Sequence, residues 1–355
     1  MLLVIFGAGA SYDSVPQLPP AAEILPAIRP PLVLNHQEND RPPLANQLFD
    51  TRPNFERAML RFPECREIIP GLRKPDAPVE RELAVLREQA KRFDRVHQEL
   101  AAVLFYLHFA IWECQRFWAD RHRGINNYVT LVRELERWRL EHNESICFVT
   151  FNYDTMLEEA MQQVLDINFD DFSKYVSRSD YVLIKLHGSV NWGLEVDGLE
   201  GESHSPQVLI RAAHHLKISK RYSFVKSHPM VLDDQGTVGY PALSIPVEAK
   251  DEFSCPESHV QTLTKLLPMV TKIITIGWRA TEADFLRVLR DALPRGKQML
   301  LIISGDEKGA NETLRNLKRE AVQPWGETIV PQYGFTGLIN NLTYLDGFLS
   351  RSQQT

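Results

Sequence analysis

The sequence predicts an α/β fold, a doubly wound parallel sheet of the Rossmann-like kind. Hydrophobic runs rich in β-branched residues recur along the chain, and most are followed by a glycine or polar turn and then by a helical pattern. This alternation is typical of parallel sheets that bury both faces. In such folds the turns meet at the carboxyl ends of the strands, where ligands bind.

Six segments carry the strand pattern. Strands are expected over 2–6, 145–150, 181–186, 272–276, 298–303 and near 327–331. Helices are expected after several of the turns, at about 155–165, 281–292 and 311–320. Weaker segments lie at 207–211 and 222–226, followed by a Gly/Pro-rich hairpin or loop around 233–246.

A long helical region separates the first strand from the second. Apolar residues recur at steps of three and four from Val79 to about Arg121, which predicts one long amphipathic helix or two helices joined at a kink. A further helix is expected over 126–141. The first strand is therefore expected to be followed by a large helical insertion.

These patterns divide the chain into three consecutive parts. Residues 1–31 form the first strand and its turn, 32–144 the helical insertion, and 145–355 the remainder of the sheet domain. A loop or hairpin excursion is expected near 200–260 within the last part.

Composition excludes several function classes. The chain has 355 residues, of which 44% are hydrophobic and 24% are charged, with a net charge of −6. This balance argues against a dedicated nucleic-acid or anionic-membrane surface. The four cysteines contain no C-x-x-C pair, so neither a disulfide framework nor a zinc site is indicated. No window reaches the ~18 apolar residues of a spanning helix, and a cytoplasmic location is expected.

The turn after the first strand is the first candidate site. Gly7 and Gly9 lack the Cβ atoms that would keep a pyrophosphate away from backbone N–H groups. Tyr12 stands where a dinucleotide fingerprint of the dehydrogenase kind has its third glycine. A tight turn without a ligand is the alternative.

Polar side chains follow the second and third strands. Asn152 and His187 each come directly after a hydrophobic run, where a fixed backbone can present a side chain to the crevice. Alternatives are open for both: His187 could hold its own turn, and Asn152 and Asp154 could cap the following helix. Trp278 could form a pocket wall or pack under a loop.

These turns, in this order, resemble those of the sirtuin family. The matching strings are Gly7-Ala8-Gly9-Ala10-Ser11, Thr150-Phe151-Asn152-Tyr153-Asp154 with Leu157-Glu158, and Lys185-Leu186-His187-Gly188-Ser189-Val190-Asn191-Trp192. A later segment, Ile276-Gly277-Trp278 followed by Asp284, is also similar, although Arg279 replaces the usual small hydroxyl residue. The longer strings resemble bacterial sirtuin-like proteins of antiphage defence rather than protein deacylases.

The resemblance implies a role for each matched position. Asn152 would orient the ribose or the attacking water, and His187 would act as general base toward ribose hydroxyls. Asp154 would contact the nicotinamide side of NAD, and the turn after the first strand would bind the pyrophosphate. The remaining positions expected to bind NAD are Gly7, Ala8, Gly9, Ala10, Ser11, Gly188, Gly277, Trp278, Ser304 and Asp306, the last two holding the adenosine half.

The function implied by the resemblance is hydrolysis of NAD to nicotinamide and ADP-ribose, as an antiphage effector. Classical sirtuins carry a four-cysteine zinc module that this sequence lacks, so no zinc is expected and water becomes the acceptor. Activation by homo-oligomerisation or by a partner such as a HerA-type ATPase is expected. An NAD-dependent protein deacylase or ADP-ribosyltransferase, and a non-catalytic subunit that binds NAD or ADP-ribose, stay open as alternatives.

Overall fold

A computed structural model describes most of the chain. The described residues are 1–13, 60–68, 79–122, 126–197, 205–228, 230–244, 253–330 and 334–351. Their contacts divide the chain into two units, which we treat separately. Unit 1 comprises Met1–Pro19, His122–His187 and Asp251–Thr355, and unit 2 comprises Pro20–Arg121 and Gly188–Lys250.

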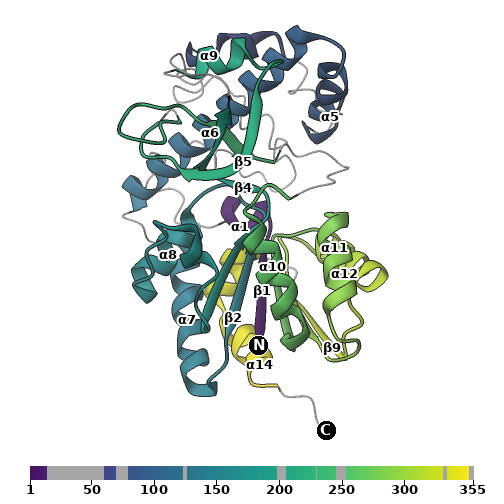
Figure 1. Cartoon of the computed structure of the whole chain (residues 1–355). Helices are drawn as coiled ribbons and strands as arrows, with labels where there is room; N and C mark the ends of the chain where they lie inside the picture. The colour runs from purple at the N-terminus through teal and green to yellow at the C-terminus, as the bar shows by residue number, and fades with distance from the viewer. Residues whose placement is uncertain are drawn as a thin grey trace, which may run out of the picture. The chain divides into compact units, whose positions relative to one another are not determined.

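Unit 1 contains a six-stranded, fully parallel sheet with helices against it (Figure 1). Its strands are β1 (Leu2–Phe6), β2 (Ile146–Thr150), β3 (Tyr181–Lys185), β7 (Lys272–Ile276), β8 (Met299–Ile303) and β9 (Gly326–Val330). The order across the sheet is β3-β2-β1-β7-β8-β9. The predicted doubly wound α/β fold is therefore confirmed.

β1 lies at the centre of this sheet and fixes its layout. Leu2 pairs with Ile146 of β2 on one side and with Lys272 of β7 on the other. All five residues of β1 are buried, as the unbroken apolar run requires of a strand covered on both faces. The strand order reverses between β1 and β7, and such a switch point is where open α/β sheets bind ligands.

The helices of unit 1 flank this sheet. They are α1 (Ala8–Tyr12), α7 (Asn127–His142), α8 (Met156–Leu165), α10 (Glu257–Leu266), α11 (Ala283–Ala292), α12 (Glu307–Glu320), α13 (Gly334–Asn340) and α14 (Thr343–Leu349), with 3-10 turns η3 (Phe172–Tyr175) and η4 (Leu267–Met269). α7 begins where the Asn126 side chain accepts from the N–H of Val129, and it ends at left-handed Asn143. Its apolar face includes the buried side chain of Tyr128.

Unit 2 combines helices with a three-stranded antiparallel sheet of order β5-β4-β6. Its elements are η2 (Pro63–Glu67), α5 (Val79–Ala90), α6 (Asp94–His122, whose last residue falls in unit 1), β4 (Gly188–Asp197), α9 (Pro206–Arg211), β5 (Lys217–Phe224) and β6 (Tyr240–Leu243). The long helical region is thus two helices, separated at 91–93. The weak segment 207–211 is helical, and 222–226 overlaps β5. Within the described ranges, no helix is long and apolar enough to cross a membrane.

The two units are not consecutive in sequence. Residues 188–250 group with 20–121, and α7 groups with the sheet of unit 1. The division into 1–31, 32–144 and 145–355 stays a prediction. Residues 14–59, which span its first boundary, lie outside the described residues.

Candidate active site

The carboxyl ends of the central strands of unit 1 are level with one another. Phe6 pairs with Thr150 and with Ile276, and Thr150 pairs with Lys185. The ladder continues by one residue, because the N–H of Phe151 donates to the Phe6 carbonyl. The turns that follow β1, β2, β3 and β7 therefore start at the same edge of the sheet, as the sequence pattern predicts.

Three of the predicted site residues form one hydrogen-bonded cluster at this edge. Ser11 Oγ donates to Asp154 Oδ2 at 2.6 Å, and Asn152 Nδ2 donates to Ser11 Oγ at 2.8 Å. Asn152 is 6% exposed. The turns after β1 and β2, which are 141 residues apart in the chain, are thus joined through side chains.

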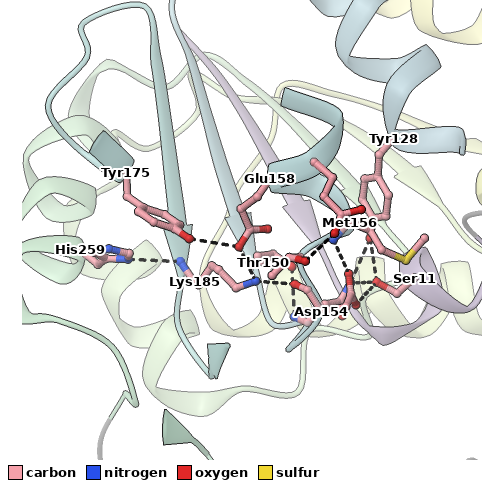
Figure 2. Close-up of polar contacts among 12 residues, drawn as sticks. Ser11, Tyr128, Thr150, Asp154, Met156, Glu158, Tyr175, Lys185 and His259 are labelled. Atoms are coloured by element: carbon pink, nitrogen blue, oxygen red, sulfur yellow. Dashed lines mark hydrogen bonds and ion pairs between the residues drawn. The ribbon is translucent and has the colours of Figure 1, made fainter. Parts of the chain in front are cut away.

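Asp154 also serves the helix that follows it. Its Oδ1 accepts from the N–H of Met156, the first residue of α8, at 3.1 Å. The carboxylate therefore bonds both to the first N–H of α8 and to Ser11 (Figure 2). The N-cap position of α8 itself is occupied by Thr155.

Tyr128 is a fourth member of the cluster, and sequence reasoning missed it. Its hydroxyl lies 3.0 Å from Ser11 Oγ and accepts from Asn152 Nδ2 at 3.2 Å (Figure 2). Burial raises the pKa of Tyr128 well above its ordinary value, and the nearby Asp154 raises it further. The phenol therefore stays protonated and can donate a hydrogen bond to Ser11 Oγ, because the Ser11 hydroxyl itself donates to Asp154.

His187 follows β3 and lies against aromatic rings. Its ring meets the edge of Phe151 at 4.8 Å between centroids, and Tyr153 is 6.4 Å away. It is 7% exposed. Phe151 also stacks on Trp278 at 5.6 Å with ring planes 13° apart. One aromatic side chain from the turn after β2 thus touches residues from the turns after β3 and β7.

Trp278 is held by polar contacts as well as by stacking. Its indole N–H donates to Glu282, and its carbonyl accepts from Thr313 Oγ at 2.8 Å. It is 4% exposed. The ring is thus buried between Phe151 and Phe285, and its role toward a ligand stays a prediction.

The glycines of the first turn have a packing role that the sequence did not reveal. A Cβ on Gly7 would lie 2.5 Å from the Gly277 carbonyl oxygen, and one on Gly277 would lie 2.4 Å from the nitrogen of Ala10. Gly277 also has φ +59°, a left-handed conformation that favours glycine. The N–H groups of Gly7 and Gly9 donate to the carbonyls of Ile276 and Gly277. These glycines let two turns pack together at the switch point, and their role toward pyrophosphate stays a prediction.

The other predicted positions make contacts of their own. Asp306 caps α12 by accepting from the N–H of Gly309, and the backbone of Ser304 bonds to Val330 and Gly334. Gly188 opens β4 in unit 2, where its φ is +86° and a Cβ would lie 1.7 Å from the Ala242 carbonyl oxygen. Among the residues whose positions are described, none of these contacts reaches Ser11, Asn152 or Asp154.

The described parts of the chain contain no group of three or more His, Cys, Asp or Glu residues that could hold a metal ion. Cys65, Cys147 and Cys255 are free and buried. Burial raises the pKa of Cys147 to about 12, so this thiol stays protonated.

Comparison with known families matches residues 146–324 to the SIR2-like domain. That span begins at the first residue of β2 and includes Asn152, Asp154, His187, Gly277 and Trp278. No curated protein matches the chain. SIR2-like domains bind NAD, and members of the family usually act on it as enzymes. Because the matched span covers half of the chain and carries these strand-end turns, the chain belongs to the SIR2-like domain family.

Proposed function

We propose that this protein is an NAD⁺ hydrolase that releases nicotinamide and ADP-ribose. The observation that carries the proposal is the hydrogen-bonded cluster of Ser11, Asn152 and Asp154 at the carboxyl edge of the parallel sheet. It joins the turns of two central strands beside the switch point of a fold whose family binds NAD. Membership of the family supports chemistry on NAD in general; the choice of water as acceptor is ours.

The reaction has few chemical demands and many positional ones. Water forms a bond to C1′ of the nicotinamide ribose while the C1′–N bond breaks. The electron pair of the C1′–N bond moves to the ring nitrogen and neutralises the pyridinium ring. One proton of the water leaves. The transition state resembles an oxocarbenium ion, so orientation contributes more than strong acid catalysis.

The cluster suits such positioning. In our proposal the carboxamide oxygen of Asn152 orients water or ribose, because its amide nitrogen is engaged with Ser11 and Tyr128. Asp154 contacts the nicotinamide side, and His187 serves as general base toward ribose hydroxyls. The turn at 7–11 binds the pyrophosphate, and Ser304 and Asp306 hold the adenosine half.

A non-catalytic subunit that binds NAD or ADP-ribose is the second candidate. The observation in its favour is that Asn152 and His187 are only 6% and 7% exposed, and that Asn152 is already hydrogen-bonded inside the protein. A closed cluster of this kind also fits an enzyme held inactive until it is triggered. We also propose that the protein forms homo-oligomers, that a HerA-type ATPase is its partner, and that it acts in antiphage defence.

The test is nicotinamide release from NAD by the purified protein, with and without a candidate ATPase partner. We expect release without added peptide, formation of ADP-ribose, and loss of at least 100-fold in Asn152→Ala and His187→Ala. His215→Ala is the matched control, because this histidine is exposed in unit 2. Release that requires an acetyl-lysine peptide would favour the deacylase. NAD binding without release under any condition would favour the regulatory subunit.

A further inference from the structure

A buried ion pair lies beside the cluster in unit 1. Lys185, the last residue of β3, donates from Nζ to Glu158 Oε1 of α8 at 2.8 Å (Figure 2). The two side chains are 0% and 6% exposed. Tyr175 also donates to the same carboxylate oxygen, at 3.3 Å. Charges removed from water in this way are costly, so the pair calls for a physical reason.

Stability alone is a weak reason. Replacing a buried ion pair with apolar side chains of similar size is often neutral or stabilising. Burial raises the pKa of Glu158, and the adjacent Lys185 ammonium opposes that rise. The Lys185 charge therefore offsets part of the cost of burying the Glu158 carboxylate.

The second bond of Lys185 suggests a different role. Nζ also donates to the backbone carbonyl of Asp154, in the turn after β2. Asp154 in turn accepts from Ser11, in the turn after β1. One ammonium group thus connects the end of β3, two residues before His187, to the turn that carries Asn152.

We propose that Lys185 is a positioning residue that holds the turn at 151–154 at a fixed distance from His187, with Glu158 as its counter-charge. The part of this inference that concerns turnover rests on the proposed NAD⁺ hydrolase function. Lys185 acts through the Asp154 carbonyl. An apolar pair at these positions fills the same space and removes the tether, together with the acceptor of the Tyr175 hydroxyl.

The double variant Lys185→Met/Glu158→Leu tests this tether in the full-length protein, because it removes both charges together and leaves no unpaired ion. A single variant, Glu158→Gln, keeps an oxygen that accepts from Lys185 and leaves the bond to the Asp154 carbonyl in place. Glu159→Gln is the matched control: it lies next in sequence, is exposed, and accepts from Thr155 instead.

The first readout is amide hydrogen exchange over 151–156, measured without NAD. We expect at least tenfold faster exchange in the double variant, with β8 unchanged, and wild-type exchange in Glu159→Gln.

The second readout is nicotinamide release. We expect kcat to fall at least 30-fold in the double variant, with KM for NAD within threefold of the wild-type value. In Glu158→Gln we expect a smaller decrease in kcat than in the double variant.

The two readouts separate the possible failures. Unchanged exchange over 151–156 in a folded double variant would overturn the tether. Faster exchange with unchanged kcat would overturn its role in turnover. If the wild-type protein releases no nicotinamide, the hydrolase proposal fails, and the exchange measurement still decides whether Lys185 holds the turn.

Discussion

The two units bury polar groups in different ways. In unit 1, Asn152 and Lys185 are buried at strand ends, and each bonds to residues from another element. In unit 2, the buried His108 lies 5.1 Å from the His228 ring, which stacks on Trp112 at 3.8 Å. The polar groups of unit 1 form a connected network, whereas these histidines of unit 2 sit among rings as neutral packing groups. Networks of the first kind hold side chains in place for chemistry.

The largest expected effect is at the switch point of unit 1. Gly277→Ala places a Cβ 2.4 Å from the Ala10 nitrogen and 2.5 Å from the Gly9 carbonyl carbon, at a residue whose φ of +59° is left-handed. We expect a loss of more than about 4 kcal/mol in the free energy of unfolding, or no folded protein. Urea denaturation followed by circular dichroism measures it.

Gly296→Ala is the control for that loss. Gly296 has a similar φ of +69°, but nothing lies within 4 Å of the added Cβ. The backbone strain alone is about 1–2 kcal/mol. Equal losses for the two variants would contradict the close packing of the turns after β1 and β7.

The second prediction uses the buried histidines of unit 2. Burial lowers the pKa of His108 to about 3, although the Val190 backbone raises it somewhat. His228, beside it and near Arg116, has a pKa lowered to about 2. Below pH 6.5 this histidine takes up a proton in the unfolded chain and stays neutral in the folded protein. The free energy of unfolding therefore decreases as pH falls from 6.5 toward 3.

His108→Gln removes this dependence. Between pH 6.5 and 4.5 we expect the wild-type protein to lose about 2 kcal/mol more than the variant, because the full 1.36 kcal/mol per pH unit applies only once the unfolded histidine is protonated. Urea unfolding at the two pH values gives the difference. Parallel losses in both proteins would show that His108 is protonated in the folded state.

The smallest expected effect concerns Tyr128. Tyr128→Phe removes the hydroxyl that contacts Ser11 and Asn152 while keeping the ring that packs 5.2 Å from Phe6. We expect a loss of about 1 kcal/mol in stability and about tenfold in kcat for nicotinamide release. Tyr344→Phe, at an exposed tyrosine, is the control. Wild-type turnover in Tyr128→Phe would remove Tyr128 from the site.

The sheet of unit 1 could be predicted from sequence because its signal is local. Apolar runs such as 146–150 are followed at once by a polar turn, and parallel strands bring those turns to one edge whatever the connections between them. The position of Asn152 and Asp154 just after β2 follows from this local signal. The predicted helices at 79–121 and 126–141 also follow from local periodicity.

The rest depends on contacts that no local pattern reveals. Tyr128 lies in a regular amphipathic helix, and nothing around it indicates a bond to Ser11, 117 residues away. The sequence predicts a ligand role for Gly7 and Gly277. Their packing against each other follows only from the pairing of β1 with β7, which no local pattern indicates. The grouping of 188–250 with 20–121 likewise follows from long-range contacts.

The central place of β1 has a consequence for how the protein is made. β1 leaves the ribosome before both of its neighbours, and one of them, β7, begins only at Lys272. At roughly 5–20 residues per second, β1 waits tens of seconds for that partner. Until then the turns after β1 and β7 cannot meet, so a nascent or prematurely ended chain carries an incomplete sheet and an unassembled site. The sheet edge at which NAD is proposed to bind is therefore completed only after β7 has been made.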